Sequence, residues 1–101
     1  DLVFVSGQIP VDPATGAMPA DVRDQARQSL ANLKAILAAA GLGMADVVKT
    51  VVFLADLNDF AAVNEVYAEA FAQPFPARSC VQVAGIPKGA KVEIECIARR
   101  P

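Results

Sequence analysis

The fold of this chain is decided by its central stretch, Val47-Val48-Lys49-Thr50-Val51-Val52-Phe53-Leu54. Most of these residues are apolar, and β-branched and aromatic side chains predominate, as in a strand that is largely buried. The pattern predicts a strand over residues 46–55. Helical patterns lie on both sides of it, so we expect this strand to belong to a sheet that helices cover.

Helical periodicity is clearest upstream, where residues 21–40 predict a helix with one apolar stripe. The stripe comprises Val22, Ala26, Leu30, Leu33, Ile36, Leu37 and Ala40. Asp21 suits the positive amino end of a helix, and Gly41 is a natural stop at its carboxyl end. Downstream, residues 56–59 offer N-cap side chains for a helix that runs to about residue 72. Its apolar face comprises Phe60, Val63, Tyr67 and Phe71.

Three further strands complete the predicted fold. Residues 2–6 predict a buried strand that ends at Gly7, and residues 78–84 and 91–99 predict two final strands. The 101 residues therefore predict a single α+β domain, a two-layer sandwich in which two helices cover one face of a mixed β-sheet. Because 54% of the residues are hydrophobic, we expect the other face of the sheet to meet a further copy of the chain.

An arginine enters the first of the two final strands, which its other residues predict to be buried, within Phe75-Pro76-Ala77-Arg78-Ser79-Cys80-Val81-Gln82-Val83. Arg78 and Cys80 are two residues apart, so their side chains share one face of a strand. The planar guanidinium group of arginine suits a carboxylate or phosphate held by two parallel hydrogen bonds. Arg78 is therefore a candidate for binding a small anionic ligand. The alternative is a structural ion pair with one of the 11 acidic residues.

The last strand alternates acidic and apolar side chains. Glu93 and Glu95 share the face opposite Val92, Ile94 and Cys96. A glutamate near an arginine can orient or activate a water molecule. The alternatives are that both glutamates are solvated strand residues or structural partners of the arginine.

Three weaker candidates lie elsewhere. Asn64 follows Phe60 by one helical turn and offers a polar contact, with plain surface as the alternative. Ser6 precedes Gly7 at the end of the first strand, where backbone groups are free to meet a ligand. Nothing basic in the sequence marks Cys80 as an activated nucleophile, so a packed thiol is the expectation.

The residue types that are missing exclude several chemistries. The chain has no histidine, two cysteines and a net charge of −2. Ser-His-Asp and Cys-His nucleophiles are therefore impossible within one chain, a zinc site is not expected, and no glycine-rich motif implies a cofactor. Without a stripe of lysine and arginine we expect no nucleic-acid partner, and no segment predicts a membrane partner. We expect free thiols and a cytoplasmic location.

The chain closely resembles the Rid proteins, also called the YjgF-like or reactive intermediate deaminase A family. Five segments carry the likeness: Val5-Ser6-Gly7-Gln8-Ile9-Pro10, residues 25–33, residues 46–54, Phe75-Pro76-Ala77-Arg78-Ser79-Cys80 and residues 92–98. They follow the family's order over nearly the whole chain. The Pro-Ala-Arg-Ser segment, followed by a last strand that bears glutamate, is the most specific of them.

The resemblance implies a chorismate-mutase-like α+β fold that assembles as a homotrimer with ligand clefts between subunits. It also implies a cofactor-independent, metal-free activity. This is the hydrolytic deamination of short 2-imino acids and their enamines, such as 2-iminopropanoate, 2-aminoacrylate and 2-iminobutanoate, to 2-keto acids and ammonia.

The resemblance also implies roles for individual residues. Arg78 would bind the substrate carboxylate through two hydrogen bonds, Glu93 would position the attacking water, and the backbone of Cys80 would hold that water or the imine nitrogen. The cleft would be lined by Ser6, Gly7 and Asn64. Family members usually carry a further N-terminal strand with a Gly-Pro-Tyr-type segment whose tyrosine reaches the cleft. The chain begins after that segment, so we expect this wall to be missing.

Two other functions stay open at this point. A non-catalytic module that binds small carboxylates would keep the fold without deamination. A ribonuclease or translation inhibitor is a label that some relatives carry, and the acidic charge balance and the lack of histidine disfavour it.

Overall fold

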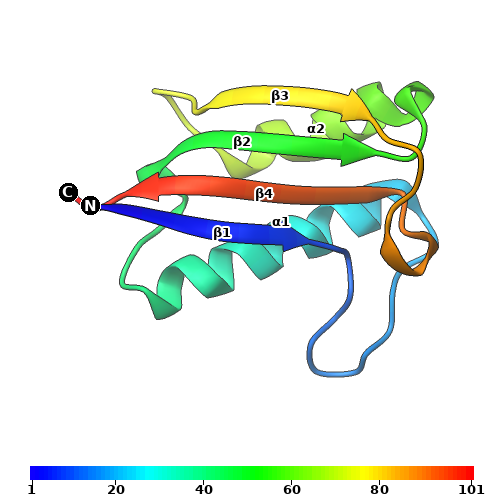
Figure 1. The fold of residues 1–101 in the computed structure, drawn as a ribbon, viewed down its shortest axis with the longest axis horizontal. Coiled ribbons are helices and arrows are strands. Elements are labelled where there is room, and N and C mark those ends of the chain that lie inside the picture. Colours follow the sequence, from blue (N-terminus) through cyan, green and yellow to red (C-terminus); the bar gives the residue numbers. More distant parts are fainter.

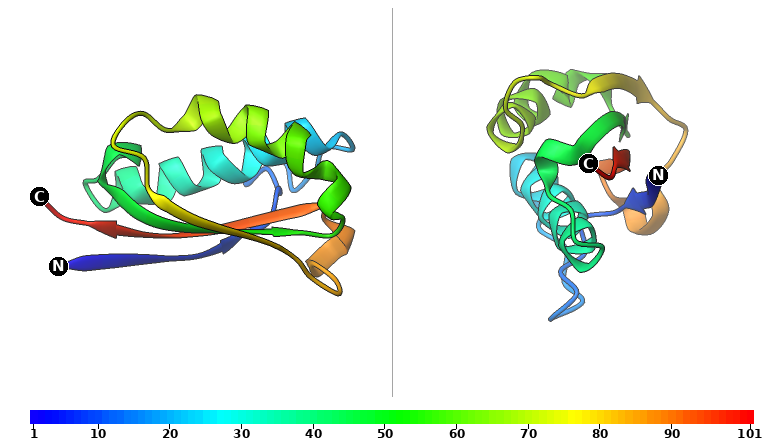
Figure 2. Two further views of the ribbon diagram at one scale, coloured as in Figure 1. Left: turned by 90° about the horizontal axis from the view of Figure 1, so that it is seen from above. Right: turned by 90° about the vertical axis from the view of Figure 1, so that its left-hand side faces the viewer.

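The computed structural model describes residues 1–101, which form one four-stranded sheet with two helices on one face (Figure 1). The strands are β1 (Leu2–Gln8), β2 (Val47–Leu54), β3 (Ala77–Gln82) and β4 (Val92–Arg99), and the helices are α1 (Val22–Ala39) and α2 (Phe60–Ala70). Short 3-10 turns lie at Met44–Asp46, Leu57–Asp59 and Pro87–Gly89. The predicted two-layer α+β sandwich is confirmed, with both helices on the same side of the sheet (Figure 2).

The sheet has the strand order β1-β4-β2-β3 and is mixed. β4 is antiparallel to both of its neighbours, whereas β2 and β3 are parallel. The parallel pair needs a crossover connection, which α2 provides. β1 and β3 are therefore the edges of the sheet. The strand that carries Arg78 is thus an exposed edge strand, and the expectation of a buried strand there was wrong.

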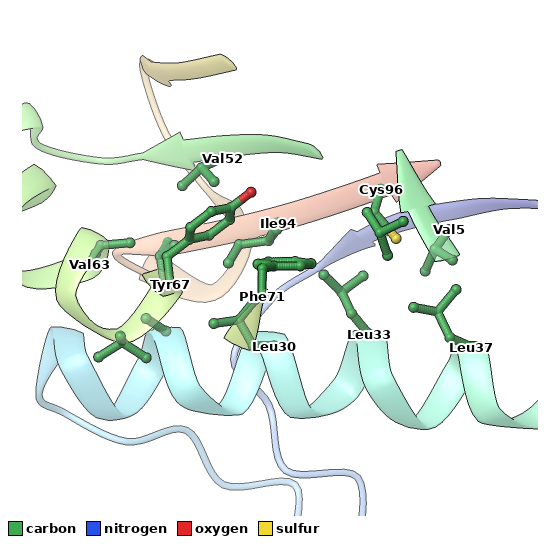
Figure 3. Close-up of a cluster of buried hydrophobic side chains, with 14 of the residues drawn as sticks. Val5, Leu30, Leu33, Leu37, Val52, Val63, Tyr67, Phe71, Ile94 and Cys96 are labelled. Carbon is green, nitrogen blue, oxygen red and sulfur yellow. The ribbon is translucent and has the colours of Figure 1, made fainter. Parts of the chain in front are cut away.

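The core lies between the sheet and the helices (Figure 3). Residues of β4 alternate strictly, with every second one buried beneath the helices. Leu33 and Leu37 of α1 are 1% and 0% exposed. Ile36, which the sequence placed in the same stripe, is 39% exposed, because it lies on the flank of the helix rather than over the sheet.

Local signals fix the ends of α1 as predicted. The Asp21 carboxylate accepts hydrogen bonds from the backbone N–H groups of Arg23 and Asp24, at 3.0 and 3.2 Å, which satisfies donors that the first turn leaves free. At the other end Gly41 adopts a φ of +77°, in the left-handed region that glycine enters without steric cost.

The face of the sheet that points away from the helices is open and partly apolar. Phe4 and Leu2 of β1 are 71% and 55% exposed, and Val81 of β3 is 43% exposed. In each strand these residues alternate with the ones that pack against the helices. No helix of the chain has the length and apolar character needed to span a membrane.

Candidate active site

The guanidinium group of Arg78 is held by one stripe of α2. In the β2–β3 register Arg78 lies opposite the buried Thr50, so its side chain is on the face that α2 covers. Its Nη1 donates a hydrogen bond of 2.6 Å to Oδ1 of Asn64. The guanidinium carbon lies 4.7 Å from the centre of the Tyr67 ring and 5.4 Å from that of Phe60. Such cation–π contacts orient a cation as well as attract it.

Arg78 forms no ion pair within the chain. The ion pairs of the chain join Arg23 to Glu65 and Arg27 to Asp24, and neither includes Arg78. The interpretation of Arg78 as half of a structural ion pair is therefore wrong for the isolated chain. The result is an exposed, oriented cation with N–H donors to spare, which is what the binding of a carboxylate requires.

A hollow of about 320 Å³ opens beside this arginine. Its lining is mostly apolar and comprises Asn64, Tyr67, Ala68, Phe71, Phe75, Pro76 and Arg78. If the carboxylate of a short ligand binds Arg78, the rest of that ligand therefore lies against an apolar surface.

Cys80 shares the helix-facing side of β3 with Arg78, as predicted, and is partly buried opposite Val52. Burial raises the pKa of the Cys80 thiol, and the nearby Arg78 opposes this only in part. The thiol is therefore protonated at neutral pH and is a poor nucleophile.

The backbone of Cys80 is better placed than its thiol to meet a ligand. The backbone N–H of Val83 donates to the Leu54 carbonyl of β2 at 2.9 Å. Along a strand every second residue points its backbone N–H and C=O groups to the same side. Those of Val83 face β2, so those of Arg78 and Cys80, which lie an odd number of residues away, point to the unpaired edge of β3. The main-chain polar groups of Arg78 and Cys80 at this edge are thus available to a ligand, in addition to the Arg78 side chain.

Glu93 lies on the opposite, open face of the sheet, next to Gly7. It is partly exposed between the buried Val92 and Ile94. A Cβ atom on Gly7 would lie 2.8 Å from Cδ and 3.1 Å from Cγ of Glu93. The glycine therefore provides the space that the carboxylate occupies. Ser6, beside it at the register shift of β1, is exposed.

The predicted site residues thus fall into two groups on opposite faces of the chain. The helix-facing group, at the β3 edge, comprises Asn64, Arg78 and Cys80. The open-face group, on β1 and β4, comprises Ser6, Gly7 and Glu93. Within one chain these groups do not meet. No set of three or more His, Cys, Asp or Glu side chains is placed to hold a metal ion.

Sequence reasoning missed the part that Tyr67 and Phe60 play at Arg78. Both were assigned to the apolar core face of the second helix, yet each contacts the guanidinium group. A signal was available, because Phe60, Asn64 and Tyr67 are spaced by four and three residues and so form one stripe of a helix.

Comparison with known proteins identifies the family. A family model described as Endoribonuclease L-PSP matches residues 1–100. The chain belongs to the YjgF/Rid family. It is 59% identical to 2-iminobutanoate/2-iminopropanoate deaminase of Escherichia coli (strain K12), over 99% of this chain and 80% of that protein. It is 61% identical to the Salmonella typhimurium (strain LT2) protein of the same name, over 98% of this chain and 80% of that protein.

The similarity to solved Rid-family structures is equally extensive. The crystal structure of E. coli TdcF with bound serine matches with a TM-score of 0.94 and 60% identity, over 99% of this chain and 81% of that one. The E. coli YjgF gene product matches with a TM-score of 0.94 and 58% identity, over 100% and 82% of the two chains. The fold and family expected from the sequence resemblance are therefore confirmed.

Proposed function

We propose that this Rid-family chain hydrolyses short 2-imino acids and their enamines, such as 2-iminopropanoate and 2-iminobutanoate, to 2-keto acids and ammonia. Relatives at 59% and 61% identity carry the name of this activity. The observation that carries the proposal is the Arg78 guanidinium group, which is oriented by α2 but unpaired with any carboxylate of the chain.

Imine hydrolysis requires an oriented substrate and a positioned water molecule. Arg78 binds the substrate carboxylate through two charge-assisted hydrogen bonds, each worth about 1.5–3 kcal/mol. Water adds to the imine carbon, and Glu93 takes a proton from the water and returns it to the nitrogen. Glu93 then carries the hydroxyl proton of this adduct to the amino nitrogen, the carbon–nitrogen bond breaks, ammonia leaves, and the carbon–oxygen double bond of the keto acid forms. The backbone of Cys80 holds the water or the imine nitrogen, and Ser6, Gly7 and Asn64 line the cleft.

We further propose that this cleft is shared between subunits of a homotrimer. Arg78 and Glu93 lie on opposite faces of one chain, so they can act on one substrate only if they come from different copies. The exposed apolar side chains of the open face, Phe4 at 71% and Leu2 at 55%, favour burial against another copy. A closed ring repeats the same contact for every subunit.

Mixing two inactive variants tests both proposals. An amino-acid oxidase generates the imine, and the release of 2-keto acid is followed with and without the protein. We expect Arg78→Ala and Glu93→Gln to be inactive alone. When the two are denatured, mixed in equal amounts and refolded together, random assembly gives about one quarter of the sites both wild-type side chains. Activity should return to about that level.

The control mixture pairs Arg78→Ala with the double variant Arg78→Ala/Glu93→Gln, which can form no complete site. Mixed assemblies that stay inactive while the wild type is active would contradict the shared cleft. A wild type that binds pyruvate in calorimetry but never accelerates keto-acid release would instead support the alternative of a carboxylate-binding module.

We also propose that residues 1–101 form one Rid-type domain and that the protein is cytoplasmic. Both cysteines, Cys80 and Cys96, are free thiols, and free thiols are typical of reducing compartments.

A further inference from the structure

A buried hydrogen bond links the aromatic ring under Arg78 to the sheet. The Tyr67 hydroxyl lies 2.8 Å from Oγ1 of Thr50, and the two residues are only 8% and 0% exposed. Figure 3 shows the Tyr67 ring between α2 and the strands, with its hydroxyl directed towards the sheet. Burial raises the pKa of Tyr67 and the Thr50 bond lowers it in part, so the hydroxyl keeps its proton at neutral pH.

Thr50 is also the residue of β2 that lies opposite Arg78 of β3. Thr50 therefore lies beside the Arg78 backbone in the sheet and also supplies the hydroxyl that bonds the Tyr67 ring. The Tyr67 ring also packs against Phe71, whose ring centre is 4.8 Å away at an interplanar angle of 41°. Arg78 is itself exposed, and a long exposed side chain normally samples many rotamers. The fixed ring removes much of that freedom.

We propose that Tyr67 and Thr50 are positioning residues for carboxylate binding by Arg78. Their hydrogen bond fixes the ring on which the guanidinium group lies, while Asn64 holds Nη1. The unengaged N–H groups are thereby presented in one orientation before the substrate arrives, which lowers the ordering cost of binding. The inference rests on the proposed function, because it takes a carboxylate as the ligand of Arg78.

A purely structural role makes a different prediction. A buried hydroxyl pair also stabilises a core simply because each group satisfies the other. In that case loss of the bond lowers stability but leaves substrate binding by the folded protein unchanged. Kinetic constants therefore separate the two roles.

Tyr67→Phe and Thr50→Val break the bond in two independent ways and keep the ring or the side-chain volume. We expect each to raise KM for 2-iminopropanoate by about two- to ten-fold, the factor that one hydrogen bond supplies, with kcat changed by less than about two-fold. The inhibition constant of pyruvate, which offers the same carboxylate, should rise in parallel. Thr50→Ser keeps a hydroxyl and should restore both constants.

Asp21→Ala is the matched control, because it removes the cap of α1 and so lowers stability without touching Arg78. It should leave KM and the pyruvate constant unchanged. Wild-type KM and inhibition constants in folded Tyr67→Phe or Thr50→Val would overturn the inference, as would a Thr50→Ser variant that behaves like Thr50→Val. Failure of the proposed function has a different signature, since the wild type itself would then not accelerate hydrolysis.

Discussion

Replacement of Gly7 by alanine tests whether the position of the Glu93 carboxylate controls catalysis. The new Cβ atom would lie 2.8 Å from Cδ of Glu93, whereas nonbonded carbon atoms pack at about 3.5–4.0 Å. The carboxylate must therefore move by roughly 1 Å. It can do so by rotating its flexible side chain into the open face, so the backbone need not shift.

This geometry separates the effect on activity from the effect on stability. A displacement of about 1 Å of a catalytic group costs on the order of 100-fold in rate, and we expect kcat to fall by about that factor. Alanine is favoured over glycine in a strand by about 0.5–1 kcal/mol, which offsets part of the crowding. The free energy of unfolding should therefore change by less than about 1 kcal/mol.

Steady-state hydrolysis of 2-iminopropanoate gives kcat, and urea denaturation gives the free energy of unfolding. Gly85→Ala is the matched control, because a Cβ atom at Gly85 would meet nothing within 4 Å. It should leave kcat unchanged and change the free energy of unfolding by no more than about 1 kcal/mol. Wild-type kcat in folded Gly7→Ala would refute the reasoning that Gly7 makes room for a catalytic Glu93.

Two further predictions concern the thiols. Because burial keeps the pKa of Cys80 above its ordinary value, Cys80→Ala should keep kcat/KM within about three-fold of wild type, and a complete loss of turnover would contradict a role for the backbone alone. Burial raises the pKa of Cys96 from 9.0 to about 11, so between these values the unfolded chain has lost a proton that the folded chain retains. The free energy of unfolding, measured by urea denaturation at several pH values, should therefore fall as the pH rises through this window. Cys96→Ala should show a smaller fall, and an equal slope in both proteins would rule out the thiol as the cause.

Local signals account for the parts of the fold that the sequence predicted well. The apolar stripe of α1, its Asp21 cap and its Gly41 stop all act within a few residues of where they stand, so their effect can be read without the rest of the chain. The alternation of Glu93 with Val92 and Ile94 is equally local. The error at Ile36 arose because periodicity marks a broad apolar stripe but does not show how far the sheet reaches beneath it.

The site could be predicted only as a set of residue types. The residue pattern named Arg78, Glu93 and Asn64 as candidates, the family resemblance gave them and Gly7 roles in one cleft, and the structure gives each of them a physical environment. The environment of Arg78 could not be foreseen from β3 alone, because the side chains that hold it come from α2. Contacts between segments far apart in sequence depend on the path of the whole chain.

The sequence by itself determined the elements, their ends and the side chains that share a face within each strand or helix, because those properties follow from the local backbone period. Only the tertiary structure decided which face of each strand lies under the helices and which faces away from them. The order β1-β4-β2-β3 puts β3 at an edge with its Arg78 face under α2, and it leaves Glu93 of β4 on the other side of the sheet. Alternation shows that a strand has two faces, but the pairing of distant strands and the path of α2 determine which face meets the helices.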